Sequence, residues 1–318
     1  MGSQCKEFIM SASQGVLPSA NLPSSGISKT NRCEPPSSAW FAGLFAVLIF
    51  SLTAPLTVVA LDVFSPAFIA FMRAFIAGIG SISLVLWFKW PLPSLKDIVW
   101  LLVGGSCIAL VFPYTLAKSL QVWQASDMGV VLAGIPLFTA LMAVGLFKEK
   151  TSIKFWVSLL VGTQVLVLFA YSQSNGVLHS ALFIMLASAG VGYAIGGHVA
   201  KRLGGFQTIC WMMVLYFPVS LFGVGYTAAE NAHGFDMQYI GPLLALLYLA
   251  VFSQWVGFRY WYGAMVQIGI AKTGQLQLTQ PFMTLIFTVP LLGASLSLVH
   301  FYFAALISLT VWWVRKSR

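Results

Sequence analysis

The most informative single residue of this chain is an arginine that lies inside a long apolar run. Arg73 is about two turns into the run 66–88, roughly 10 Å along a helix that rises 1.5 Å per residue. A cation in such surroundings is costly unless it faces water, a carboxylate or backbone carbonyls. Arg73 could therefore bind a ligand's carboxylate or phosphate. Alternatively, it is a structural arginine that snorkels outward or pairs with Asp62 or Asp127.

A stripe of polar side chains lies on one face of the apolar run 272–293. Gln277 and Gln280 are three residues apart and share a helix face with Thr273 and Thr284. Such side chains either join neighbouring helices or line a surface for a polar ligand. The length of the stripe favours the ligand surface. Four residues of other runs lie at a depth that suits the same cavity, although each alone is more typical of packing: Tyr114, Tyr193, Trp211 and Gln254.

The composition predicts a protein that crosses a membrane several times. Of the 318 residues, 59% are hydrophobic and 8% are charged, and the mean hydropathy is +0.88. A soluble core of this size could not bury so much apolar surface. The net charge of +9 does not indicate a nucleic-acid partner, because the basic residues occur singly or in small groups between apolar runs.

Apolar runs of about twenty residues predict ten transmembrane helices. Their expected ranges are 39–60, 66–88, 98–120, 127–147, 153–172, 177–199, 206–227, 241–265, 272–293 and 296–314. The Ser- and Pro-rich segment 1–37 has no helical or strand periodicity, and we expect it to be a disordered cytoplasmic tail.

The distribution of basic residues orients these helices. With a cytoplasmic amino terminus, nearly all Lys and Arg residues between the runs fall inside, whereas the outer segments hold Lys118 together with Asp62, Glu230 and Asp236. The positive-inside rule therefore predicts that both termini are cytoplasmic. We expect a multi-pass protein of the cell inner membrane or plasma membrane.

Two segments of the chain are weak copies of each other, namely 126–149 and 271–294. When they are aligned, Pro136 matches Pro281. A proline inside a membrane helix frees a backbone carbonyl, which neighbouring protein or a watery cavity can satisfy. A single kink is ordinary, but matched kinks in two halves are typical of transporter binding sites. Because each half holds five runs, an odd number, the second half is expected to be inverted relative to the first.

The aligned copies place Asp127 and Lys272 at equivalent helix starts. An acid is favourable at a helix amino terminus, so Asp127 needs no further role there. Lys272 is unfavourable in that position and should contact water, lipid phosphate or a carbonyl. Both residues could form gating contacts, although solvated helix ends are the simpler interpretation.

The chain resembles the drug/metabolite transporter superfamily, in its ten-helix EamA-like branch, over residues 39–314. The resemblance rests on loose motifs in a specific order: Ser65-Pro66, Arg73, Tyr114, Ala125-Ser126, Pro136, Lys148-Glu149-Lys150, Tyr193, Lys201-Arg202, Tyr260, Ala264, Lys272 and Pro281. It implies that spans 1–4 and 6–9 line the pathway, that spans 5 and 10 are peripheral, and that small metabolites are exported or exchanged. One departure is Ala294, which stands where Glu149 predicts a second glutamate, so no symmetric pair of carboxylates is expected.

These observations predict an all-helical membrane protein with two inverted five-helix repeats, 38–172 and 177–314. The expected function is alternating-access transport of a small polar metabolite, with amino acids as the leading class and export as the expected direction. A lipid or lipid-carrier flippase of the same fold is the alternative. An intramembrane enzyme is less plausible, because no nucleophile or metal motif is present. We expect no cofactor and no metal, and leave a homodimer open.

Energy coupling is not evident from the sequence. No Asp or Glu lies near the centre of any predicted span, so no carboxylate relay crosses the membrane. This favours exchange or uniport over proton antiport, unless a histidine or tyrosine network supplies the proton path.

Overall fold

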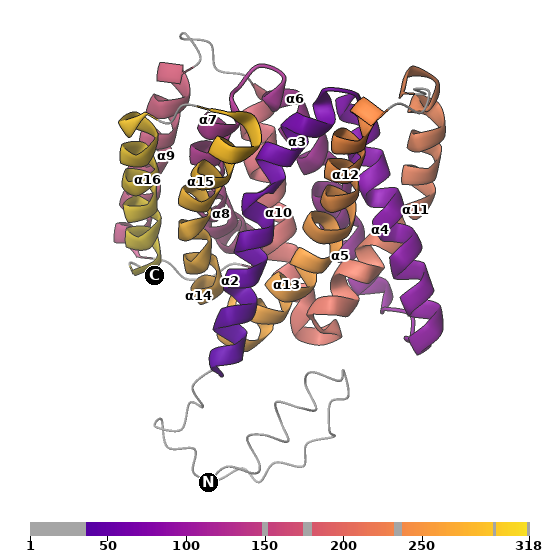
Figure 1. Cartoon of the computed structure of the whole chain (residues 1–318). Coiled ribbons are helices and arrows are strands. Elements are labelled where there is room, and N and C mark those ends of the chain that lie inside the picture. Colours follow the sequence, from indigo (N-terminus) through magenta and orange to yellow (C-terminus); the bar gives the residue numbers. More distant parts are fainter. Residues whose placement is uncertain (1–35, 148–151, 174–179, 232–236, 295–296, 317–318) are drawn as a thin grey trace, which may run out of the picture.

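The computed structural model describes residues 36–147, 152–173, 180–231, 237–294 and 297–316, and every regular element in these residues is helical (Figure 1). Apart from its last two residues, the predicted tail lies outside the described residues. Helix α2 (Ser37–Ser51) begins, and helix α16 (Leu298–Lys316) ends, at the lower end of the bundle in Figure 1. We call that end the terminal face and the opposite end the distal face.

The first half of the chain forms five helical stretches that follow the predicted spans. After α2 come α3 (Thr53–Leu61), α4 (Pro66–Phe88), α5 (Leu95–Gly105), η1 (Ser106–Val111), α6 (Phe112–Leu120), α7 (Ala125–Leu132), α8 (Ile135–Phe147) and α9 (Ile153–Gln173). The helix α4 is well defined at its start, because the Ser65 hydroxyl accepts the Phe68 N–H at 3.3 Å and Pro66 occupies the first turn.

The second half forms five further stretches. Before α16 these are α10 (Ser180–Leu203), α11 (Gly205–Thr227), η2 (Ala229–Asn231), η3 (Met237–Tyr239), α12 (Ile240–Tyr248), η4 (Leu249–Val256), α13 (Gly257–Ile268), α14 (Ile270–Leu276), η5 (Gln277–Thr279) and α15 (Gln280–Leu292). The prediction of ten helices is thus confirmed, with boundaries that differ by a few residues.

Seven of the helical stretches in the described residues are long and apolar enough to cross a membrane. Two further apolar helices, Leu159–Gln173 and Leu298–Thr310, are shorter. The predicted span 272–293 is not among these seven, and its helix contains the 3₁₀ turn η5. Large apolar side chains such as Trp87 and Phe222, 81% and 76% exposed, cover the outside of the bundle, as a hydrocarbon environment requires.

Several stretches change their helical geometry part-way along. The element η1 in the third stretch and η4 in the eighth are π-helical, and η5 is a 3₁₀ turn. In the fourth stretch, α7 ends immediately before a break at Ala133 and Gly134, followed by Pro136. The break at Ala133 and Gly134 precedes Pro136, and the turn η5 precedes Pro281. These are the places where the two matched prolines predict kinks, because proline has no N–H and crowds the preceding turn.

The helices of the two halves are interleaved. The most extensive contact joins α4 to α11, where small residues such as Gly78 and Gly223 allow the aromatic side chains Phe217 and Phe71 to approach closely. On the opposite side of the bundle, at the left in Figure 1, α9 packs along α16. The fifth and tenth stretches are therefore peripheral, and the middle of the bundle is built by the remaining eight.

Candidate functional site

Arg73 lies in the middle of the bundle and is only 1% exposed. Its Nη2 donates to Ser253 Oγ at 3.2 Å, and the Ser253 hydroxyl lies 2.8 Å from that of Thr53. Within the described residues, Nε and Nη1 of Arg73 have no hydrogen-bond partner, and neither Asp62 nor Asp127 forms an ion pair with it. The guanidinium therefore keeps unsatisfied donors, which are costly to bury and suited to an anion.

A small cavity of about 10 Å³ lies beside Arg73, about the space of one water molecule. Its lining comes from seven of the ten stretches and from both halves: Phe50, Thr53, Arg73, Phe112, Leu132, Ile135, Tyr193, Ser253, Phe258 and Gln280. Aromatic rings form much of the wall, with the Phe50 and Phe258 centroids 5.1 Å apart. The site thus combines one cation, a few polar groups and apolar walls, as small-molecule sites commonly do.

The amide stripe reaches this cavity through one of its two glutamines. Gln280 lines the cavity, and its Oε1 accepts a hydrogen bond from Gln277 Nε2 at 3.3 Å. Gln277 lies behind it, 1% exposed, and interacts with the Tyr193 hydroxyl. Gln277 begins the 3₁₀ turn η5, and Gln280 begins α15 directly before Pro281. The structure therefore brings together Arg73, Tyr193, Gln277 and Gln280.

Gln254 lies one residue beyond Ser253 and bonds to the backbone. Its Nε2 donates to the carbonyl of Ile108 at 3.0 Å, so the π-helical segment η4 is joined to the π-helical segment η1. A π-helix leaves carbonyls displaced from the regular pattern, and a side-chain donor can satisfy one of them. Gln254 does not line the cavity beside Arg73. Its hydrogen bond to Ile108 instead gives it a structural role, in which it holds two helices together.

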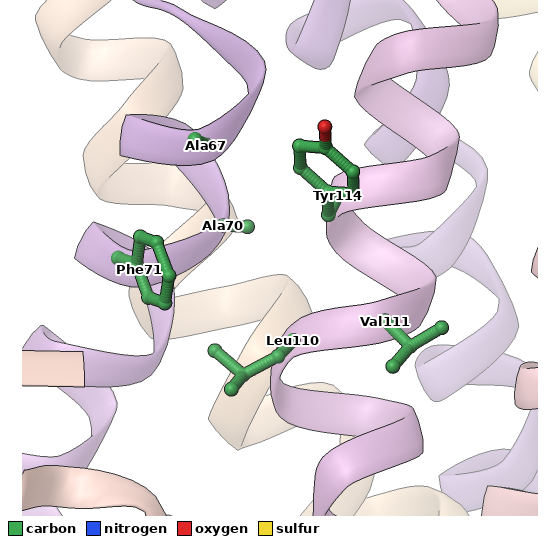
Figure 2. Close-up of a pocket in the computed structure, with 6 residues that line it drawn as sticks. All are labelled: Ala67, Ala70, Phe71, Leu110, Val111 and Tyr114. Atoms are coloured by element: carbon green, nitrogen blue, oxygen red, sulfur yellow. The ribbon is translucent and has the colours of Figure 1, made fainter. Parts of the chain in front are cut away.

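Trp211 and Tyr114 lie away from the cavity of Arg73. Trp211 is 5% exposed and packed in the apolar core. Tyr114, 40% exposed, belongs to a groove of about 280 Å³ between α4 and the stretch formed by η1 and α6. Figure 2 shows its ring facing the groove opposite Phe71, with Ala70 and Leu110 between them. The two sites share no lining residue.

The predicted gating residues have different surroundings. Pro136 and Pro281 are the second residues of α8 and α15, the carboxyl-terminal parts of their broken helices, and each directly follows a residue that lines the cavity, Ile135 and Gln280. The side chain of Lys272 lies outside the part of the chain that the structure describes. Asp127 is not solvated, because His300 Nε2 lies 2.9 Å from its Oδ1. The sequence contained no local signal for this partner.

With the geometry established, comparisons with known proteins identify the family. The sequence profile of the EamA-like transporter family matches residues 37–171. The chain is also 34% identical over 253 residues to the uncharacterized transporter YdeK of Bacillus subtilis (strain 168), an alignment that covers 79% of this chain and 87% of YdeK. The chain belongs to the EamA-like transporter family. It is a membrane transporter of the drug/metabolite transporter superfamily, not an enzyme.

The fold agrees with a known crystal structure. That protein superimposes on this EamA-like transporter with a TM-score of 0.57 at 16% sequence identity, covering 86% of this chain and 95% of the other. At this identity the likeness shows a shared fold and nothing about the substrate.

The sequence did not single out three polar residues of this transporter. Thr53 and Ser253 are hydroxyl residues within apolar runs, where such residues are common. His300 lies near the start of an apolar run, 173 positions from Asp127. Only the fold could show that these distant residues meet.

A second ion pair lies at the terminal face of this EamA-like transporter. Arg202, in the last turn of α10, donates through Nε to Asp97 Oδ1 at 2.9 Å and through Nη2 to the same oxygen. Ser94 caps the start of α5 and donates to the other oxygen of Asp97 at 2.7 Å. The pair therefore joins the first half of the chain to the second.

Replacing Arg202 with alanine should destabilise the protein by about 1 kcal/mol, because the Asp97 side chain, 9% exposed, loses its charged partner. The neighbouring variant Lys201→Ala serves as the control, since Lys201 is exposed and forms no ion pair in the described part of the chain. Thermal unfolding in detergent should show a lower midpoint for Arg202→Ala alone. Equal midpoints for the two variants would contradict a stabilising role for the ion pair.

Proposed function

We propose that this transporter carries a small anionic or zwitterionic metabolite, with amino acids as the leading class, and binds its acidic group at Arg73. The observation that carries the proposal is the buried guanidinium, whose Nε and Nη1 have no partner among the described residues. A carboxylate would complete the hydrogen bonds of this otherwise costly buried group. A planar guanidinium also matches a carboxylate through two parallel hydrogen bonds.

The other polar groups of the cavity suit the rest of an amino acid. Gln280, with Gln277 behind it, and the Tyr193 hydroxyl supply both donors and acceptors. The walls formed by Phe50 and Phe258 would accept an apolar side chain. Since the cavity measures about 10 Å³, the helices around it have to separate to admit a substrate, which is consistent with alternating access.

We infer that the two halves are inverted repeats that move against each other. In support, π-helical segments lie in the third and eighth stretches, and breaks before proline lie in the fourth and ninth, at corresponding places of the two halves. The pairs Asp97–Arg202 and Asp127–His300 join the halves at opposite ends of the bundle. The charge distribution supports a cytoplasmic terminal face.

The test is uptake of a panel of labelled amino acids into proteoliposomes by the wild type and by the double variant Gln277→Ala, Gln280→Ala. Loss of the Gln280 amide, which lines the cavity, and of the Gln277 amide, which holds it in place, each contributing about 0.5–1.5 kcal/mol, should lower transport roughly 5- to 150-fold. The control is Gln267→Ala, an exposed glutamine of α13. Efflux from preloaded vesicles measures export. Normal transport by the double variant would exclude these glutamines from the site.

A lipid is the second candidate substrate, and the groove beside Tyr114 is the observation that favours it. Its lining is apolar apart from the tyrosine hydroxyl, and Tyr114 is 40% exposed at its edge (Figure 2). Such a groove can hold an acyl chain, but no charged residue lines it to bind a headgroup. If no amino acid is transported, movement of a fluorescent phospholipid between leaflets in the same proteoliposomes would support this alternative.

A further inference from the structure

The helices α7 and α15 meet between the cavity of Arg73 and the distal face. Helix α7 begins towards the distal face and ends with Leu132, which lines the cavity. Helix α15 begins with the cavity-lining Gln280 and runs back towards the distal face (Figure 1). The two helices pack against each other along this route. We call their interface the distal seam.

The distal seam is closed by a contact between small residues. Thr284 lies four residues after Gln280, about 6 Å nearer the distal face along α15. A Cβ atom at Gly129 would lie 2.9 Å from Thr284 Cγ2, so the glycine allows α7 to approach α15 closely. Ser126 precedes Gly129 by three residues and shares its helix face. The two helices would therefore have to separate before a solute could pass between them.

Two hydroxyl groups of the distal seam are buried without hydrogen bonds. Ser126 and Thr284 are 0% and 1% exposed, and neither hydroxyl has a partner among the described residues. In contrast, the buried Thr139 and Thr288 donate to carbonyls one turn earlier, at 3.0 and 2.7 Å, as such residues commonly do inside helices. An unsatisfied hydroxyl is costly to bury. This cost would be relieved in a conformation in which water or a polar solute enters the seam.

The unsatisfied groups of the distal seam continue those of the cavity. Nε and Nη1 of Arg73 also lack partners in the described part of the chain. Gln280 lines the cavity with Arg73, and Thr284 lies on the same face of α15 one turn further. Ser126 lies beyond Gly129 on the facing helix, nearer the distal face. Hydrogen-bonding groups thus follow one another from the buried guanidinium to the distal end of the seam.

The surroundings of the distal seam indicate which helix can move. Helix α7 is held by the bond between Asp127 and His300 to α16, and α16 packs along α9. Helix α15 packs instead against α2 and α3. It ends at Gly293, whose φ of 62° lies in the left-handed region that favours glycine. The seam can therefore open by a movement of α15, while α7 stays against α16.

We propose that the distal seam is the gate to the distal face, and that the hydroxyl groups of Ser126 and Thr284 line the path between that face and Arg73. The proposal rests on the proposed function, since it requires a solute that binds at Arg73. The groups that the path accepts are water and a small polar solute, because a hydroxyl can both donate and accept hydrogen bonds.

The first experiment closes the distal seam with a disulfide bond. A Cβ atom at Gly129 would lie 3.2 Å from Thr284 Cβ, slightly closer than the about 3.5–4.5 Å of a disulfide, so a small shift allows the double variant Gly129→Cys, Thr284→Cys to be bridged. The oxidised double variant should lose uptake of the labelled amino acids into proteoliposomes, and dithiothreitol should restore it. The two single variants and the wild type, treated with the same oxidant, are the controls and should keep their uptake.

The second experiment needs no transported substrate. The variant Ser126→Cys in lipid nanodiscs is treated with a negatively charged methanethiosulfonate, which reacts with thiols that water reaches. An open state populated to about 0.1–10% should let this thiol react at about that fraction of the rate of a free thiol. The control is Ser220→Cys, because Ser220 is also 0% exposed but donates to the Phe217 carbonyl at 2.8 Å within α11. It should not react above the wild type, whose native cysteines set the background.

Full uptake by the double variant, with the disulfide shown by electrophoresis without reductant, would overturn the gate. Failure of the disulfide to form would show that α7 and α15 are not in contact in the membrane, and would overturn it as well. So would equal labelling of Ser126→Cys and Ser220→Cys. If Ser126→Cys is labelled selectively but the wild type transports no amino acid, the gate is supported and the proposed substrate class is wrong.

Discussion

Replacing Arg73 with alanine is expected to lower transport of the accepted amino acid by roughly 30-fold or more, because a substrate carboxylate loses its buried charged partner, a change of about 2–5 kcal/mol. Stability should respond in the opposite sense. The guanidinium is buried with unsatisfied donors, so its removal also eliminates a desolvation cost and should leave the unfolding midpoint unchanged or higher. Transport assays and thermal unfolding of the same preparation measure both effects.

Two variants sharpen this result. Arg73→Lys keeps a positive charge but loses the planar pair of donors, so its transport should be intermediate. Arg259→Ala is the matched control, because Arg259 is an exposed arginine of α13 that lies over the Phe206 ring at 4.4 Å and should contribute only about 0.5–1 kcal/mol to stability. If Arg73→Ala lowers the unfolding midpoint while the folded protein transports normally, Arg73 is a structural residue.

A large loss of stability is expected from Gly190→Ala, where α10 crosses α8. A Cβ atom at residue 190 would lie 2.7 Å from the carbonyl carbon of Phe138 and 2.9 Å from the amide nitrogen of Thr139. Because these are backbone atoms, they cannot be relieved by a rotamer change, and the two helices must move apart. Overpacking of this kind costs about 1–3 kcal/mol, and the unfolding midpoint in detergent should fall accordingly.

The control for this effect is Gly145→Ala in α8, since a Cβ atom there would have no neighbour within 4 Å. Alanine favours the helix over glycine by about 0.5–1 kcal/mol, so Gly145→Ala should be neutral or stabilising. A similar gain for Gly190→Ala would show that α8 and α10 are not in close contact in the membrane.

Hydrophobic run lengths were sufficient to predict the helices of this fold. Ten runs of about twenty residues correspond to ten helical stretches, since a bilayer imposes that length on each crossing. The breaks next to Pro136 and Pro281 were also predictable, because proline cannot complete the helical hydrogen bonds. The π-helical segments were not predictable, since η1 and η4 are stabilised by contacts between distant parts of the chain, such as Gln254 with Ile108.

The centre of the candidate site was partly predictable. Arg73 is unusual for its depth in an apolar run, and a single sequence suffices to recognise it. Its hydrogen-bond partner Ser253 is 180 positions away, and a serine in an apolar helix is by itself unremarkable. The partner of Asp127 could not be found in the same way, because helix-dipole considerations already explained an acid at that position.

The two π-helical segments give their helices a freedom that a continuous α-helix lacks. A π-helix accommodates an extra residue in its turn, and if that residue is taken up by the flanking α-helix, the far end turns by about 100° around its own axis, the angle of one residue. Backbone hydrogen bonds are exchanged during such a change, not lost to the lipid. The segment η4 carries Ser253, which bonds to Arg73. Such a rotation of η4 would therefore withdraw the acceptor Ser253 Oγ from the guanidinium, without unfolding any part of the helix.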